Sequence, residues 1–151
     1  MMARFGNIAL KVLLGSGYFG VLFLVACGVA APGAQLPEGA VRFDPPAVYR
    51  AWWNATERCS GHSRNFSSVS WYVDGTNSIP VTGPPKVGLW YGSPFGSAIV
   101  VAGSWTGSEL VVRHEMLHHL LRDEHHPAEY FVARCHLTWE SFGHTPSHGA
   151  G

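Results

Sequence analysis

After residue 46 the chain repeats apolar residues with the period of an α-helix. Asp44 can cap such a helix, Pro46 suits its first turn, and the pattern stops at Gly61. The apolar positions follow one another at i, i+4, i+7 and i+11, and they are Val48, Trp52, Ala55 and Cys59. The pattern predicts a helix with one buried stripe, and it places the side chain of Cys59 in the core.

A second helical pattern appears later in the chain. Thr106 and Glu109 have the spacing of a capping box, which predicts that this helix starts just before Leu110. Its apolar residues at helical spacing are Leu110, Leu117 and Leu121. A shorter last helix is predicted to start at Pro127 and to carry Cys135.

Four short segments between the helical patterns are rich in β-branched and aromatic residues and are bounded by Gly, Pro, Asp or Asn. They are Ser67–Gly75, Ser78–Gly83, Lys86–Gly92 and Ser97–Gly103. The order helix, strands, helix, helix predicts an α+β fold, in which the first helix backs a short sheet that is mixed or antiparallel.

The first 26 residues do not share this pattern. Arg4 and Lys11 precede an apolar run from Val12 to Ala26, which is shorter than the about 20 residues of a membrane span and has the length of a signal-peptide core. The run ends in LVAC, closed by Cys27, which resembles a bacterial lipobox. The resemblance implies cleavage before Cys27, lipidation of this cysteine, and export to the bacterial cell envelope, on the periplasmic or the outer surface. Cleavage near residues 28–31 and an uncleaved anchor are the alternatives, and both also export the domain.

The remaining boundaries follow from composition. Residues 27–46 are rich in Pro, Gly and Ala and have no apolar period, which predicts a flexible tether. We expect the folded domain over residues 47–142 and a disordered tail over residues 143–151.

Charge and cysteine content narrow the class of protein. Ten basic residues balance ten acidic ones, so the sequence predicts no nucleic-acid partner. The chain has three cysteines, and if Cys27 is lipidated, Cys59 and Cys135 remain as a pair. An exported location permits a disulfide between them, whereas two buried free thiols are the alternative.

The stretch from Val111 to Tyr130 is rich in histidine and contains the sequence HEMLH. His114 and His118 stand at i and i+4, so both imidazoles lie on one helix face and can reach one zinc ion. Glu115 lies about 100° around the helix, where it can hold the water bound to that ion and take its proton as general base. Two histidines on a solvated helix face that bind no metal are the alternative.

Because this motif lies on a predicted amphipathic helix, the chain resembles the zincin metallopeptidases over roughly residues 46–139. The resemblance implies one catalytic zinc ion and cleavage of peptide bonds, with His114 and His118 as zinc ligands and Glu115 as base. It also implies that the last strand before the active helix, here Ser97–Gly103, forms the rim of the cleft. An extended polypeptide would pair with the edge of that strand.

A third zinc ligand is expected in the turn between the last two helices. His126 is the first choice, because Pro127 holds its backbone while its side chain can turn back towards the metal. The alternatives are Asp123 and His125, then Glu124, Glu129 and Glu140. Metzincins place this ligand where the chain has Glu124, but here no glycine precedes it, and the ligand glutamate of gluzincins corresponds to Glu140. A ligand from the turn leaves the fourth position of zinc open for water.

Together these features predict an exported zinc metallopeptidase that hydrolyses polypeptides and is held to a membrane by a lipid on Cys27. One alternative is a non-catalytic zinc-binding lipoprotein, either a metal carrier or an inactive zincin used for protein interaction. A structural envelope protein whose histidines bind no metal is the other.

Overall fold

The computed structural model describes residues 35–94 and 96–143, and four strands within them form one mixed sheet in the order β1-β2-β4-β3. The strands are β1 Val41–Arg42, β2 Val69–Asp74, β3 Gly88–Ser93 and β4 Gly96–Ala102. β2 and β4 are parallel, whereas β1 pairs with β2, and β3 with β4, in antiparallel fashion. The predicted signal peptide, Cys27 and nearly all of the predicted tail lie outside the described residues.

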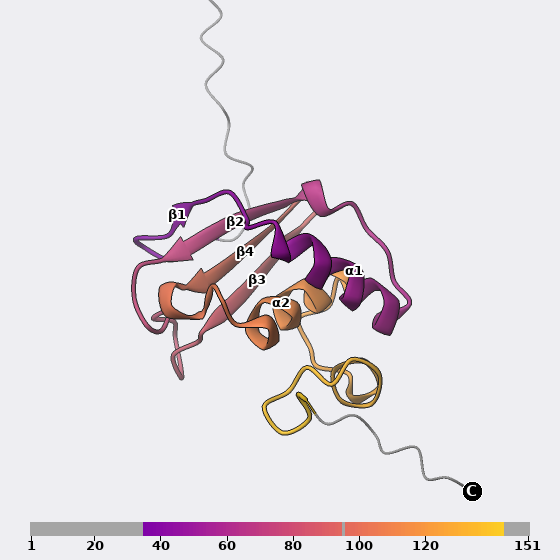
Figure 1. Ribbon diagram of the computed structural model, residues 1–151. Helices are drawn as coiled ribbons and strands as arrows, with labels where there is room; N and C mark the ends of the chain where they lie inside the picture. Colours follow the sequence, from indigo (N-terminus) through magenta and orange to yellow (C-terminus); the bar gives the residue numbers. More distant parts are fainter. Residues whose placement is uncertain (1–34, 95, 144–151) are drawn as a thin grey trace, which may run out of the picture. The chain divides into compact units, whose positions relative to one another are not determined.

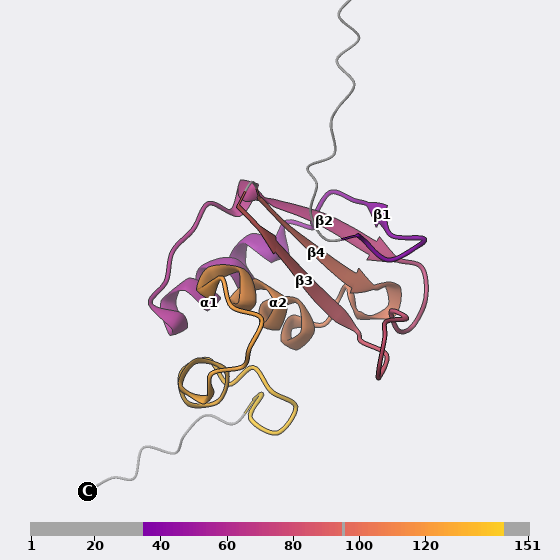
Figure 2. The same cartoon turned by 180° about the vertical axis from the view of Figure 1, so that it is seen from behind.

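Two helices cover the same face of the sheet, α1 Val48–Ser60 and α2 Glu109–Leu121 (Figures 1 and 2). Short helical turns precede β2 and α2, namely η1 Phe66–Ser68 and η2 Gly103–Trp105. A short π-helix, η3 Glu129–Arg134, follows α2. The predicted α+β fold, with a backing helix, a small mixed sheet, the helix that carries HEMLH and a further helix after it, is confirmed.

The core that positions α2 lies between the sheet and both helices. Its buried residues are Tyr49, Trp53, Phe66, Val69, Trp71, Ile99, Val101, Val111, Val112, Met116 and Leu120. The hydroxyl of Tyr49 donates a hydrogen bond of 2.8 Å to the carbonyl of Thr106, which ties α1 to the segment before α2. Because large side chains fill both sides of α2, the helix can rotate little about its axis, and its histidines face a fixed direction.

The buried face of α1 lies one residue further along than the predicted stripe. Its buried residues are Tyr49, Trp53, Thr56 and Ser60, whereas Val48 is 45% exposed. Thr56 and Ser60 tolerate burial because their hydroxyls donate to the carbonyls of Trp52 and Glu57. The expected cap by Asp44 is also wrong, since α1 begins after Ala47 without a side-chain cap.

α2 begins where the sequence predicts, but a different residue caps it. The hydroxyl of Ser108 accepts a hydrogen bond from the backbone N–H of Val111 at 3.4 Å. The hydroxyl of Thr106 instead donates to the carbonyl of Gly103. The chain makes the tight turn η2 between β4 and α2, and this turn moves the helix start past Thr106.

Three of the four predicted strands coincide with β2, β3 and β4, and the segment Ser78–Gly83 does not form a strand. Ile79 alone pairs there among the described residues, in an isolated bridge with Lys86. Ile79 is buried with Val100 and Ala102 on the sheet face opposite the helices, and Leu36 and Ala40 pack against them. Leu36, Ala40 and β1 fall within the range predicted as a tether, so the folded part begins before residue 47.

Cys59 and Cys135 form the predicted disulfide, across a sequence separation of 76 residues. The bond joins the last turn of α1 to the residue that ends η3. The segment after α2 is therefore held to the backing helix by a covalent link.

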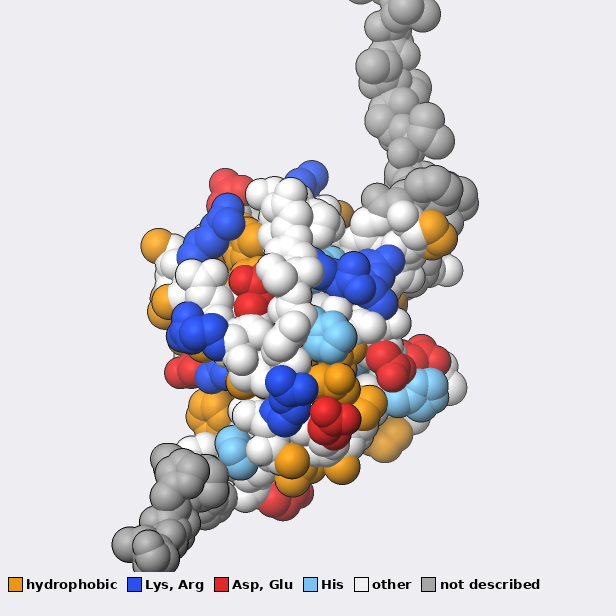
Figure 3. Space-filling model, turned by 90° about the vertical axis from the view of Figure 1, so that its right-hand side faces the viewer, with side chains coloured by type: hydrophobic (Ala, Val, Ile, Leu, Met, Phe, Trp, Pro, Cys, Tyr) orange, Lys and Arg blue, Asp and Glu red, His pale blue; other side chains and the backbone are white. Residues whose placement is uncertain are grey.

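The surface carries charges of both signs, and Figure 3 shows acidic, basic and histidine side chains interspersed on one side of the molecule. Within residues 35–94 and 96–143, no helix has both the length and the apolar character that crossing a membrane requires.

Candidate metal centre

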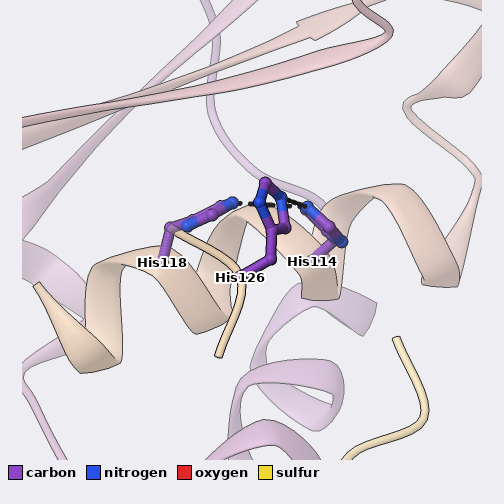
Figure 4. Close-up of side chains that lie close together, drawn as sticks. All are labelled: His114, His118 and His126. Atoms are coloured by element: carbon purple, nitrogen blue, oxygen red, sulfur yellow. Dashed lines mark hydrogen bonds between the residues drawn. The ribbon is translucent and has the colours of Figure 1, made fainter. Parts of the chain in front are cut away.

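Three histidine side chains meet beside α2. His114 and His118 come from consecutive turns of the helix, and His126, the first choice for the third ligand, comes from the turn after it (Figure 4). The Nε2 atom of His114 lies 2.9 Å from Nε2 of His126 and 3.3 Å from Nε2 of His118. One ligand atom from each residue thus lies within 4.8 Å of the other two.

Backbone carbonyls fix the rings of the two helical histidines. Nδ1 of His114 donates to the carbonyl of Leu137 and Nδ1 of His118 to the carbonyl of Asp123, each at 2.7 Å. Because a carbonyl can only accept, each Nδ1 carries the proton, and each Nε2 presents a lone pair to the cluster. Burial lowers the pKa of His114 and lowers the pKa of His118 to about 4, so both rings are neutral at pH 7.

Aromatic side chains enclose the cluster. The ring of Phe131, buried in η3, lies 4.8 Å from the rings of His114 and His118 and 4.9 Å from the ring of His126. The ring of Trp90 in β3 stacks on His118 at 6.2 Å with an interplanar angle of 11°. These contacts restrict the rotation of the imidazoles, so that the nitrogens keep their directions without a bound ligand.

The other candidates for the third ligand do not join the three histidines. The side chain of His125 donates to the carboxylate of Asp123 at 2.7 Å, and the two side chains are 79% and 39% exposed. Glu129 pairs with Arg134 at 3.5 Å. Glu124 and Glu140 are exposed and line two different hollows next to the site.

The geometry of the cluster suits a metal ion. With zinc–nitrogen bonds of about 2.0–2.1 Å, two ligands of a tetrahedral zinc ion stand about 3.3 Å apart, close to the Nε2 separations of 2.9 and 3.3 Å. Lone pairs that face one another at such distances repel unless a cation lies between them. The three histidines can therefore hold a metal ion.

Glu115 lies next to the cluster with its side chain against the backbone of β3. A Cβ atom added to Gly88 would lie 2.7 Å from Oε1 of Glu115, so glycine leaves the space that the carboxylate occupies. Glu115 is 7% exposed, and its carboxylate has no hydrogen bond to any described residue. Burial raises the pKa of Glu115 to about 8, and the ammonium group of Lys86 partly opposes this shift.

Two hollows meet at Glu115, and both are also lined by His114, His126 and Lys86. The first, of about 250 Å³, extends to Leu110, Val111 and the segment Leu137–Glu140. The second, of about 260 Å³, extends along β3 to Leu89 and Trp90 and reaches Glu124. Open space is therefore present on both sides of the carboxylate.

The rim strand expected from the zincin resemblance is not the one that the structure places there. β4, which corresponds to Ser97–Gly103, lies between β2 and β3 and has a partner on each side. The edge strand beside the histidines is β3, which precedes β4 in the chain and forms an antiparallel hairpin with it. The expectation came from the zincin resemblance, and it is wrong because β4 has a hydrogen-bonded strand on each side and so has no free edge.

The disulfide contributes to the centre through residues 131–137, the segment that contains Cys135. Cys135 precedes Leu137 by two residues, and the carbonyl of Leu137 orients His114. Phe131, Cys135 and Leu137 are buried in one cluster with Leu117 of α2. The link to Cys59 thus holds the segment that provides both the aromatic contact and the carbonyl acceptor.

Sequence reasoning missed four contributors: Phe131, Trp90, Gly88 and the carbonyl of Leu137. Phe131 was open to prediction, because it stands four residues after Pro127 and faces back over the first turn of the last helix. The other three depend on the antiparallel return of β3 and on the path of the chain after Cys135, which no short sequence pattern indicates.

No family model matches the chain, and no curated protein and no solved structure matches it either. The function of the centre is therefore inferred from its own geometry.

Proposed function

We propose that the protein is a zinc-dependent peptidase whose metal is held by His114, His118 and His126. The convergence of three Nε2 atoms beside a buried carboxyl group carries this proposal. Imidazole nitrogens suit zinc, and three protein ligands leave a fourth position for water, as in catalytic rather than structural sites. The group that the described residues offer consists of these three histidines.

A zinc ion held by these histidines would supply a bound water with a pKa of about 7 and would polarise the carbonyl of the scissile bond. Glu115 would take the proton of that water and return it to the leaving amine. Burial raises the pKa of Glu115, and a zinc ion beside it would oppose that shift and favour the carboxylate that accepts the proton. Trp90, Phe131 and the two carbonyl acceptors keep the imidazoles oriented throughout.

The proposed substrate class is polypeptide. β3 is the edge strand beside the histidines, and a peptide that extends along it can add to the sheet through backbone hydrogen bonds. Such a peptide would lie across the junction of the two hollows, with its scissile carbonyl near Glu115.

We further propose that the protein is exported and held to a bacterial membrane by a lipid on Cys27. The apolar run before LVAC supports this proposal. The disulfide between Cys59 and Cys135 fits an oxidising compartment outside the cytosol.

Metal analysis and one substitution test the proposed activity. The purified protein should contain close to one equivalent of zinc and should cleave members of a peptide library. Glu115→Gln should abolish cleavage and keep the zinc, because Glu115 is not a ligand. Zinc binding without cleavage under any condition would favour the non-catalytic zinc-binding lipoprotein, and absence of zinc would favour a structural envelope protein.

A further inference from the structure

The residue that ends α2 is unusual for its backbone conformation. Arg122 has φ 59° and ψ 38°, the left-handed conformation that glycine adopts most readily. Its backbone N–H donates to the carbonyl of His118, and the N–H of Asp123 reaches the same carbonyl at 3.3 Å. This turn directs the carbonyl of Asp123 onto Nδ1 of His118 and leads the chain back to His126.

The side chain of Arg122 reaches away from the helix to the hairpin of β3 and β4. Its Nη1 donates to the hydroxyl of Ser97 at 2.7 Å, and its Nη2 donates to the carbonyl of Ser93. The guanidinium also lies over the ring of Trp90, 5.8 Å from the ring centroid. Trp90 also stacks on His118. Arg122 therefore contacts both the hairpin and the tryptophan that packs on His118.

We propose that Arg122 is a positioning residue for the metal centre, an inference that rests on the proposed zinc site. Its guanidinium holds the end of α2 against the edge hairpin, and these contacts offset the cost of a left-handed backbone at a residue with a side chain. Arg122 thereby aligns three parts of the centre: the carbonyl acceptor of His118, the stack of Trp90, and the turn that carries His126.

Glycine at this position separates the two contributions of Arg122. Arg122→Gly relaxes the backbone, because glycine adopts a positive φ without strain, but it removes every guanidinium contact. If only the turn mattered, the variant would bind zinc as well as the wild type. If the guanidinium positions the centre, zinc affinity falls although the helix end is less strained.

Zinc affinity should be measured by competition with a chelating dye, together with the absorption spectrum of the cobalt-substituted protein. We expect Arg122→Gly to weaken zinc binding by about tenfold or more, in the range found for residues that orient ligands, and to change the cobalt spectrum. Arg58→Gln is the matched control, because Arg58 is exposed at the end of α1 and is absent from both hollows. This control should keep the affinity within about twofold and leave the spectrum unchanged.

Ser97→Ala provides a second measurement if Arg122→Gly fails to fold. It removes one acceptor of the guanidinium without touching α2, and it should weaken zinc binding severalfold in the same direction. Wild-type zinc affinity in both Arg122→Gly and Ser97→Ala would overturn the positioning role. A wild-type protein that binds no zinc would instead remove the proposed function itself.

Discussion

The two sources of ligands in this centre are built differently. His114 and His118 stand on a helix that is buried between α1 and the sheet, whereas His126 stands in an exposed turn. The rings on the helix are fixed by carbonyl acceptors and by packing, while His126 depends on Phe131 and on the path of the chain around Pro127. A pair of ligands can therefore be specified by local spacing, but a complete metal centre needs tertiary structure.

The largest expected effect comes from removing a ligand of the helical pair. His118→Ala should weaken zinc binding by roughly a thousandfold, since one of the few ligands of a zinc ion contributes about 3–4 kcal/mol to its binding free energy. Competition with a chelating dye measures this change. His126→Ala should cost less, because water can replace a ligand in an exposed turn, and equal losses would contradict the proposed difference between the two regions.

Breaking the disulfide tests how far the turn region depends on tertiary links. The double variant Cys59→Ser, Cys135→Ser should lower the free energy of unfolding by about 4 kcal/mol, because the bond closes a long loop, with a sequence separation of 76 residues. Denaturant unfolding measures this loss. Zinc affinity should fall as well, because Phe131 and Leu137 stand on either side of Cys135 and both contact His114. Unchanged zinc affinity would show that the centre is held without the link.

The contact between Gly88 and Glu115 offers a test on the strand side of the centre. Gly88→Ala places a methyl group 2.7 Å from Oε1 of Glu115, which is too close, so the carboxylate must move. Hydrolysis should fall roughly hundredfold, as expected for a displaced catalytic group, while zinc stays bound. Gly75→Ala is the matched control, because an added Cβ there has no neighbour within 4 Å. Loss of zinc together with activity would mean that Gly88 supports the fold rather than Glu115.

The smallest effect concerns the charge of Glu115 in the metal-free protein. Its folded pKa of about 8 lies above its ordinary value of 4.5, so this group favours folding below pH 4.5, and that contribution is lost as pH rises through about 8. Glu115→Gln should therefore stabilise the metal-free protein at pH 8 and change its stability little at pH 4. Unfolding at both pH values, in the presence of a chelator, measures the difference. A stability gain of equal size at both pH values would point to packing rather than to charge.

The same contrast explains which parts of the molecule could be predicted. β2, β3, β4 and α2 follow from local patterns of apolar residues, and HEMLH specifies its own geometry because residues at i and i+4 share a helix face. The disulfide between Cys59 and Cys135 was predicted from the number of cysteines and from the proposed export. His126 was chosen for its position before Pro127, and the structure brings it to the helical pair.

The errors arose where tertiary contacts override local pattern. Thr56 and Ser60 are buried in α1 because their hydroxyls are satisfied by the helix backbone, which apolar periodicity does not register. Residues 36–42 looked like a tether because of their Pro and Gly content, yet Leu36 and Ala40 pack on the second face of the sheet and residues 41–42 pair with β2. β3 forms the edge of the sheet because the next strand, β4, inserts between β3 and β2. The sequences of the individual strands do not indicate this strand order.

Arg122 belongs to the same group of tertiary effects. The absence of glycine after HEMLH in the sequence gives no hint of how the chain leaves the helix, and in the structure a contacted arginine adopts the left-handed conformation instead.

X-ray absorption at the zinc edge tests the central claim most directly. The zinc-loaded protein should show one zinc ion bound by three imidazole nitrogens at about 2.0–2.1 Å and by one oxygen that anions can replace. The same measurement on His126→Ala should show one imidazole fewer. A zinc ion enclosed by four protein donors, or a spectrum that His126→Ala leaves unchanged, would contradict a catalytic centre built from these three histidines.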